Sequence, residues 1–387
     1  MKGKNKIQLA STDTCTGCAA CASVCPTGSI SMKEDREGFL QPHIDTKTCI
    51  GCNKCEKTCP ILNPLEIPTG FETQAYAAIN KDEDVRMRSS SGGMFHALAK
   101  WTIEQGGVVF GARFNDQWEV VHDYTETIEG IEPFMRSKYV QSRIGDTFNQ
   151  AKQFLDSGRQ VLFVGTPCQI GGLKAYLKKD YDNLLSVDFI CHGVPSPSIW
   201  KSYLREEFDI KSINEICFRD KKDGWLKDRC VTINTKDAII YRKPHMENQF
   251  FAGFIGDFYL RRSCYNCEYK DYHRLSDITL SDFWGIQYVL PETNDDRGTS
   301  LVFVHTRKGE CIWQLLPQIN AKLINDAYGV VVKYNASMIK SVDNTYNRNI
   351  FYMISPFCKI KVAINAIKNN IFLIRVLRKI NKIIVNL

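Results

Sequence analysis

The sequence predicts a small N-terminal α+β module, then a larger α/β domain with a mixed sheet, and last a basic amphipathic helix. A run of four cysteines occurs twice within the first 60 residues. From residue 74 onward, strand-like and helix-like stretches alternate, which is typical of an α/β domain. The chain of 387 residues is long enough for two or three domains. We expect three parts, residues 8–66, 74–355 and 356–387.

The formal charge of +7 is confined to the C-terminal part. Residues 356–387 contain seven Lys or Arg and no acidic residue, so the 355 residues before them balance to zero. A neutral body argues against nucleic-acid binding, which needs basic residues gathered on a folded face. The chain lacks the apolar run of a secretory signal and the roughly 18 apolar residues of a membrane span. We therefore expect a cytoplasmic protein, in which the 16 cysteines suit metal ligation better than disulfides.

The two cysteine runs share the spacing Cys-x2-Cys-x2-Cys-x3-Cys-Pro and begin 34 residues apart. In this motif three thiolates bind one 4Fe-4S cluster and the fourth binds the neighbouring cluster. The predicted ligand sets are Cys15, Cys18, Cys21 and Cys59 for one cluster, and Cys49, Cys52, Cys55 and Cys25 for the other. Zinc sites do not explain two consecutive runs that end in Cys-Pro. The module resembles bacterial two-cluster ferredoxins, so a ferredoxin-like fold and electron transfer are expected.

Two connecting segments complete this module. Residues 29–45 carry apolar side chains on both sides of Gly38, which predicts a short hairpin. Residues 61–73 are proline-rich and predict a linker. A short tether implies that an electron partner of the module lies in the same chain.

A serine- and glycine-rich loop begins the candidate chemistry of the larger domain. Ser89, Ser90, Ser91, Gly92 and Gly93 precede a helical stretch. Glycines at a helix start let backbone N–H groups approach an anion, and hydroxyls add hydrogen bonds, so the loop suits a phosphate. A serine N-cap on a flexible loop is the alternative.

Four further cysteines form a second candidate site. Cys168 and Cys191 each follow an expected strand, whereas Cys264 and Cys267 form a Cys-x2-Cys pair. Loops at strand ends build sites in α/β sheets, so a third 4Fe-4S cluster is one interpretation. Buried structural cysteines and a zinc ribbon are the others. The following stretch, residues 277–285, either lines a cofactor or packs a core, and His192 is the one histidine of interest.

Six motifs in residues 74–300 resemble the coenzyme F420 hydrogenase/dehydrogenase beta-subunit family. They are SSSGG from Ser89, SKYVQS from Ser137, GTPCQ from Gly165, CHGVPSP from Cys191, FRDKKDGW from Phe218 and CYNCEYKDYHRLSDITLSDFWG from Cys264. The family contains flavoproteins that bind FAD and pass electrons between iron–sulfur clusters and an organic acceptor. The resemblance implies that Cys168, Cys191, Cys264 and Cys267 hold a third cluster near the flavin. It places FAD against residues 89–93 and against Ser137, Lys138 and Tyr139.

Two functions follow from these features. The first is an FAD-dependent iron–sulfur oxidoreductase, in which electrons pass along the ferredoxin clusters and a third cluster to FAD and then to an organic substrate. A ferredoxin or a reductase would be its redox partner. Relatives fused to ferredoxin modules resemble products of bacterial polysaccharide-synthesis loci, so coenzyme F420 is not the expected substrate. The alternative is a non-catalytic subunit that delivers electrons to a separate enzyme; the sequence assigns no catalytic acid or base.

The C-terminal residues predict an amphipathic helix. Basic residues recur every seven positions beside an apolar band. The basic residues are Lys361, Lys368, Arg375 and Lys382, and the band is Ile364, Ile367, Ile371, Ile374 and Leu377. Such a helix can lie on an anionic membrane, here the inner face, or dock on its own protein or on a partner.

Overall fold

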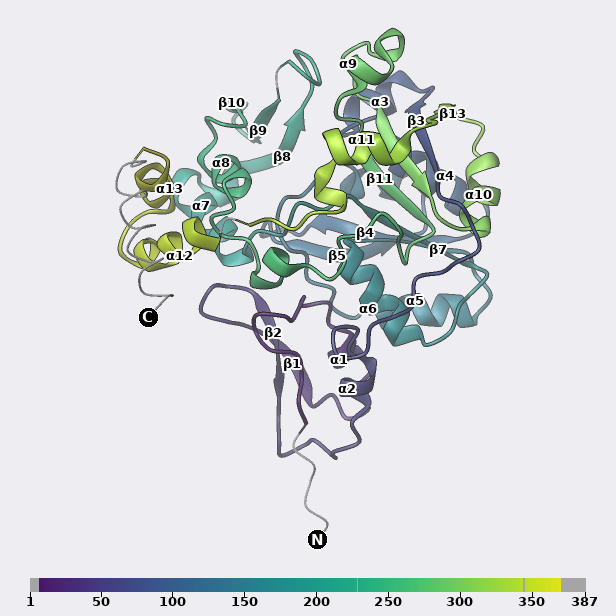
Figure 1. Ribbon diagram of the computed structural model, residues 1–387. Coiled ribbons are helices and arrows are strands. Elements are labelled where there is room, and N and C mark those ends of the chain that lie inside the picture. Colours follow the sequence, from purple (N-terminus) through teal and green to yellow (C-terminus); the bar gives the residue numbers. More distant parts are fainter. Residues whose placement is uncertain (1–6, 228, 344, 370–387) are drawn as a thin grey trace.

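The N-terminal module stands beneath the larger domain in the computed structural model, which describes residues 7–227, 229–343 and 345–369 (Figure 1). Its strands β1 (Ile30–Glu34) and β2 (Leu40–Ile44) pair in antiparallel fashion. The short helices α1 (Ala20–Ser23) and α2 (Lys54–Thr58) each lie within one cysteine run. The hairpin predicted around Gly38 is confirmed, and this glycine has a φ of +79°, which other residues rarely adopt.

An eight-stranded mixed sheet forms the centre of the larger domain, in the order β13-β3-β12-β11-β7-β6-β4-β5. The neighbours β4–β6, β6–β7 and β7–β11 are parallel, and the other pairs are antiparallel. The strands are β3 (Gln74–Asn80), β4 (Val108–Phe114), β5 (Val120–Thr125), β6 (Val161–Val164), β7 (Leu184–Phe189), β11 (Ile278–Asp282), β12 (Ser300–Val304) and β13 (Ile319–Leu323). The predicted α/β domain with a mixed sheet is confirmed.

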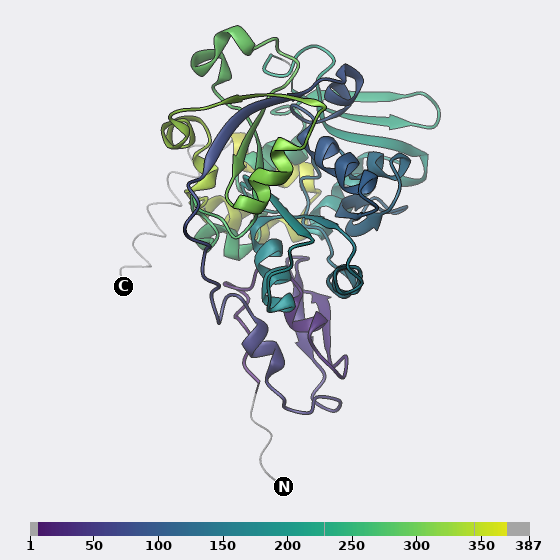
Figure 2. The same ribbon diagram turned by 90° about the vertical axis from the view of Figure 1, so that its right-hand side faces the viewer.

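Helices cover both faces of this sheet because successive strand residues point to opposite sides. On β4, Val108 and Phe110 pack toward α5 and α6, whereas Val109 packs toward α4. Figure 2 shows the α6 side of the domain directly above the module. The helices around the eight-stranded sheet are α3 (Glu83–Arg88), α4 (Met94–Glu104), α5 (Thr147–Asp156), α6 (Pro167–Leu177), α9 (Ile286–Val289), α10 (Arg307–Gln314) and α11 (Ala327–Tyr334).

A three-stranded antiparallel sheet, in the order β10-β9-β8, forms a second core beside the first. Trp200, Tyr203 and Phe250 are among its fully buried side chains. Its elements are α7 (Pro197–Glu207), β8 (Ile213–Asp220), β9 (Cys230–Thr235), β10 (Ile240–Pro244), α8 (Gln249–Ile255), α12 (Thr345–Ile354) and α13 (Ile360–Asn369). Single 3-10 turns complete the chain: η1 (Glu129–Phe134), η2 (Ile210–Ser212), η3 (Arg262–Asn266), η4 (Pro291–Thr293), η5 (Ala336–Met338) and η6 (Ser355–Phe357).

The start of the predicted C-terminal helix is α13, and it packs on its own protein. Ile364 and Ile367 are buried in the second core, against α7 and α8. The predicted continuation through Ile371, Ile374 and Leu377 lies outside the described residues. No described helix combines the length and the apolar character needed to cross a bilayer.

A buried arginine joins the module to the larger domain. Arg261, which is 1% exposed, donates from Nε to the carbonyl oxygen of Cys15 at 2.7 Å and from Nη2 to that of Leu40 at 3.0 Å. Its Nη1 donates to Oε1 of Gln141 at 3.0 Å. Every guanidinium nitrogen therefore has an acceptor, as a buried cation requires.

A carboxylate of the hairpin turn adds a second set of contacts. Glu37 accepts from Arg262 at 2.7 Å and also pairs with Arg348 of α12. Burial raises the pKa of Glu37, but the two guanidinium groups outweigh it and hold the pKa below its ordinary value. The module is thus held by residues from both η3 and α12.

We predict that Arg261→Met destabilises the docked protein by about 3 kcal/mol, because it leaves buried carbonyl groups without a donor. Arg262→Met is the matched control, since its side chain is 45% exposed and such ion pairs contribute up to about 1 kcal/mol. Anaerobic urea denaturation, followed by absorbance in the visible range, measures both. Equal midpoints for the two variants would contradict the role given to Arg261.

Candidate iron–sulfur and flavin sites

The duplicated cysteine runs have the same backbone conformation. Gly17 and Ala19 have φ values of +69° and +63°, and the corresponding Gly51 and Asn53 have values of +70° and +55°. In each run the left-handed residues wrap the chain around its thiols, and a short helix begins directly afterwards. Left-handed backbone is unfavourable for alanine and asparagine side chains relative to glycine, so the same strained turn is held at the same place in both runs.

The first predicted ligand set is brought together. Cys15, Cys18, Cys21 and Cys59 line one small cavity. Burial raises the pKa of Cys18 to about 11, and Cys15 and Cys59 add to this rise. Burial and the same neighbours raise the pKa of Cys21 as well. Buried thiols of this kind ionise only when a positive group offsets their charge, so the four sulfurs fit an iron–sulfur cluster.

The second predicted set lies nearer the surface. Cys52 is exposed, and Cys25 and Cys49 are half-buried. Cys25 is close enough to Cys55 to contribute to its raised pKa, of which burial is the main cause. The crossed pairing predicted from the motif therefore has Cys25 beside the second run and Cys59 beside the first.

Cys168, Cys191, Cys264 and Cys267 also converge. Burial raises the pKa of Cys168, and the other three thiols raise it further, so all four lie within electrostatic reach of one another. Burial raises the pKa of Cys191 to about 11 and that of Cys264 to about 12. The Thr166 hydroxyl lies 3.1 Å from Sγ of Cys168. This donor set fits a third cluster as the first set does.

Among the described residues, no three His, Cys, Asp or Glu side chains gather tightly enough for a single metal ion.

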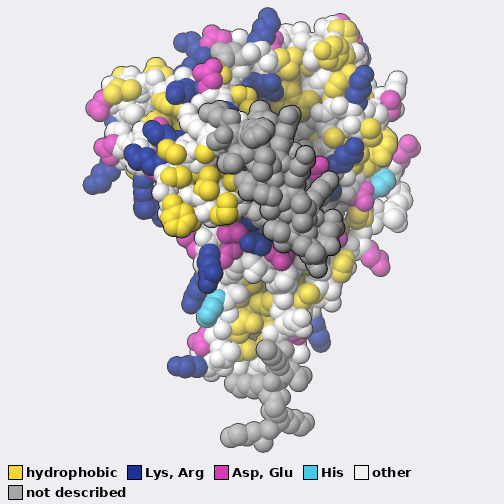
Figure 3. Space-filling model, turned by 60° about the vertical axis from the view of Figure 1, so that its left-hand side comes forward, with side chains coloured by type: hydrophobic (Ala, Val, Ile, Leu, Met, Phe, Trp, Pro, Cys, Tyr) yellow, Lys and Arg dark blue, Asp and Glu magenta, His cyan; other side chains and the backbone are white. Residues whose placement is uncertain are grey.

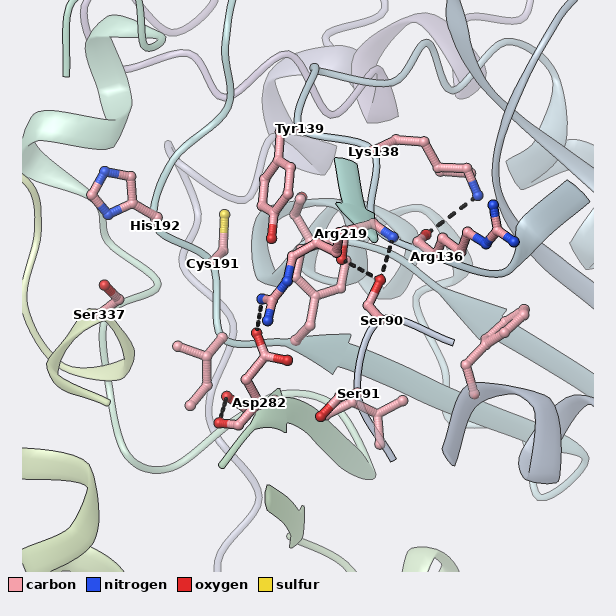
Figure 4. Close-up of a pocket in the computed structure, with 18 of the residues that line it drawn as sticks. Ser90, Ser91, Arg136, Lys138, Tyr139, Cys191, His192, Arg219, Asp282 and Ser337 are labelled. Atoms are coloured by element: carbon pink, nitrogen blue, oxygen red, sulfur yellow. Dashed lines mark hydrogen bonds and ion pairs between the residues drawn. The ribbon is translucent and has the colours of Figure 1, made fainter. Parts of the chain in front are cut away.

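A cavity of about 680 Å³ adjoins this third set of thiols. Cys191 and His192 line one side of it, and residues 89–91, Gly93 and the strip from Arg136 to Val140 line another. Figure 4 shows Cys191 and His192 across the pocket from Lys138 and Arg136, with Arg219 between them. The volume lies within the range of small-molecule and cofactor sites.

The two segments predicted to hold flavin contact each other at this cavity. Oγ of Ser90 accepts from the backbone N–H of Ser137 at 2.8 Å and from its hydroxyl at 3.0 Å. The hydroxyl of Ser90 thus keeps its own proton for another acceptor. The hydroxyls of Ser89 and Ser91 donate to the carbonyl oxygens of Val85 and Thr299.

Glycine is required at two positions of this loop. A Cβ on Gly92 would lie 2.3 Å from the carbonyl oxygen of Ala78, and Gly93 has a φ of +86° as the N-cap of α4. The 11-residue helix α4 therefore begins at the cavity, where its first N–H groups favour an anion. The role of this loop as a phosphate site stays a prediction.

The ammonium group of Lys138 is bound to backbone carbonyl oxygens at the edge of the cavity. Its Nζ donates to the carbonyl oxygens of Pro133 at 2.8 Å and Met135 at 2.6 Å. Burial lowers its pKa to about 7, and nearby Arg136 contributes to the lowering. Tyr139 packs against Phe251 and Phe254 at the cavity wall.

The cavity wall is held together by side chains with no role assigned from the sequence and by Asp282 and Trp284 of the 277–285 stretch. Lys221 donates to the carbonyl oxygen of Ser91 at 2.9 Å, and Nε1 of Trp225 donates to that of Ser90 at 3.1 Å. Arg219 pairs with Asp282, and Trp284 stacks on Trp225 with ring centroids 5.2 Å apart. Asp282 and Trp284 line the cavity. The Asp277 carboxylate instead accepts hydrogen bonds from the backbone N–H and the hydroxyl of Ser186, which join the start of β11 to β7.

Comparisons with known proteins bear on both parts of the chain. Residues 158–324 match the family model for the C terminus of the coenzyme F420 hydrogenase/dehydrogenase beta subunit. Residues 14–62 match the model of the 4Fe-4S dicluster domain. The resemblance drawn from the motifs is confirmed. The chain is an iron–sulfur protein that functions in electron transfer.

Several solved chains match this one, and one of them belongs to a hydrogenase complex. It is a chain of the F420-reducing NiFe hydrogenase complex from Methanosarcina barkeri, with 16% identity and a TM-score of 0.48. The match covers 76% of the present chain and 94% of the hydrogenase chain. No curated protein sequence matches.

We predict that Cys168→Ala lowers the iron content from about twelve to about eight atoms per chain, because one of three four-iron clusters is lost. Cys217→Ala, which removes a buried thiol of β8, should leave the iron content unchanged. Iron and sulfide analysis of anaerobically purified protein measures both variants. Twelve irons in Cys168→Ala would remove this residue from the ligand set.

Proposed function

We propose that the chain is an FAD-dependent iron–sulfur oxidoreductase that passes electrons from its ferredoxin-type clusters to an organic substrate. The observation that carries this proposal is the cavity of about 680 Å³ that borders Cys191, one of four converging thiols. When bound, iron–sulfur clusters exchange single electrons, and a flavin converts them into pairs. The chain's own residues position these groups and exclude water from them.

The phosphates of FAD are proposed to lie at the start of α4. The Ser90 hydroxyl supplies a donor there, and the helix N-terminus supplies backbone N–H groups. Lys221 and Trp225 keep the loop in place through its carbonyl oxygens. The isoalloxazine ring is then proposed to occupy the part of the cavity that Cys191 and Tyr139 line. Lys138 donates to carbonyl oxygens of its own segment, those of Pro133 and Met135, instead of contacting the flavin directly.

A redox partner, either a ferredoxin or a reductase, is proposed to dock at the free end of the module. Cys52 of the second set is exposed there, and the neighbouring Ile50 is 62% exposed. On the path from this end to the larger domain, electrons would then pass the first set of thiols. The link to bacterial polysaccharide synthesis rests on the resemblance alone.

The family description names a subunit, which favours one alternative: a non-catalytic chain that carries electrons to a separate enzyme. The two functions differ in flavin content. About twelve irons and one FAD per chain support the oxidoreductase, whereas about eight irons without flavin support the alternative.

We predict that Ser90→Ala weakens FAD binding about tenfold to a hundredfold, because it removes a hydrogen bond to a charged group. Ser157→Ala is the control, since that exposed hydroxyl donates only to the carbonyl oxygen of Phe154. Titration of flavin-depleted protein with FAD, followed by flavin fluorescence, measures the affinities. Protein that neither contains nor binds FAD would refute the proposed oxidoreductase.

The C-terminal part is proposed to touch the inner face of the membrane. Phe357 and Val362 are 88% and 49% exposed and lie beside Lys359 and Lys361. Four of the chain's seven C-terminal basic residues follow after residue 369. The rest of the visible surface carries acidic and basic side chains side by side (Figure 3). Exposed apolar groups next to cations suit an anionic bilayer.

We predict that replacing Phe357 and Val362 together with serine weakens binding to phosphatidylglycerol-containing vesicles by at least about tenfold, because two apolar contacts are lost. Ile239→Ser with Ile240→Ser is the matched control, since these side chains are 65% and 66% exposed on the β9–β10 hairpin and lie outside residues 356–387. Vesicle co-sedimentation measures the binding. Wild-type protein that stays in the supernatant would exclude membrane contact.

A further inference from the structure

One face of α6 carries both a thiol of the third set and the contact with the first set. Cys168 is the second residue of α6, and Gly171 and Gly172 follow it by three and four positions. Residues at these spacings share one face of a helix, and four residues rise about 6 Å along its axis. Whatever packs on Gly172 therefore lies about one helical turn from Cys168.

The side chain that packs on Gly172 is Cys18. A Cβ on Gly172 would lie 2.7 Å from Cβ of Cys18 and 2.9 Å from its Sγ, which leaves no room for a methyl group. Glycine inside a helix costs about 1 kcal/mol relative to alanine. The two successive glycines thus weaken α6, and the close approach of a ligand thiol offsets this cost.

Tyr269 fills the neighbouring position on the same face. A Cβ on Gly171 would lie 2.5 Å from the Tyr269 hydroxyl, and Tyr269 follows Cys267 by two residues. The Tyr269 ring therefore lies directly against the turn of α6 that joins Cys168 to Gly172.

We propose that this α6 face, with Gly171, Gly172 and Tyr269, is the junction at which electrons cross between the module and the larger domain. The cluster that Cys15, Cys18, Cys21 and Cys59 would hold would give up one electron here, and the cluster that Cys168, Cys191, Cys264 and Cys267 would hold would accept it. A one-electron carrier protein of the ferredoxin class resupplies the first cluster. The inference rests on the three clusters of the proposed function but needs neither FAD nor a substrate.

Paramagnetic resonance of the fully reduced protein tests the junction. The difference between wild type and Cys168→Ala identifies the signal of the third cluster, which should be split by the spin of its neighbour. The splitting should vanish in Cys18→Ala/Cys21→Ala and persist in the matched Cys52→Ala/Cys55→Ala, which alters the same positions of the other run. Splitting that survives loss of the first cluster, or that is lost with the second, would overturn the proposal.

A second measurement concerns Tyr269. In rapid-freeze experiments with dithionite, Tyr269→Leu should slow reduction of the third cluster, whereas Tyr272→Leu should leave its rate unchanged. Tyr272 packs against Phe303 and Tyr328, away from the thiols. Equal rates in wild type and in a fully iron-loaded Tyr269→Leu would remove the ring from the junction. An iron content of eight in wild type would instead refute the third cluster, so the two failures are distinguishable.

Discussion

Arg261 joins the first cysteine set of the module to the third set in the larger domain. It donates to the cysteine loop through the Cys15 carbonyl oxygen and to the hairpin through that of Leu40. The backbone carbonyl oxygen of Arg261 accepts from the backbone N–H of Cys264 in the third set. A buried cation is stable only with all its donors used, so the module has few alternative positions. Gly17 permits this contact, because a Cβ there would lie 2.7 Å from Nη1 of Arg261.

Helix α6 is the second element on which the sites depend. Its start is fixed by a capping box, in which Thr166 and Gln169 each bind the other's backbone, and by Pro167 in the first turn. This start sets the place of Cys168 between β6 and the cavity. The same helix then presents its glycines to Cys18. One helix thus carries Cys168 of the third set of thiols and the glycine that contacts Cys18 of the first set.

The sequence predicted those parts that depend on local spacing. The cysteine motif predicted the crossed sets, and alternation of apolar segments predicted the hairpin and the mixed sheet. It could not predict Arg261, Lys221 or Tyr269, because their partners are far away in the chain: Cys15 lies 246 residues before Arg261, and Ser91 lies 130 residues before Lys221. The glycines after Cys168 were the one local signal for the α6 contact. Periodicity placed Ile364 on an apolar face but did not reveal that α7 and α8 cover it.

The ion pair between Glu37 and Arg348 spans 311 positions. During translation, the cysteine runs therefore leave the ribosome long before α12 exists to secure the hairpin. Until then the Glu37 carboxylate lacks this guanidinium partner, and the contacts within the hairpin and the short helices are the ones the module can already form. The docked position of the hairpin turn thus depends on a residue that is made only when almost the whole chain has been synthesised.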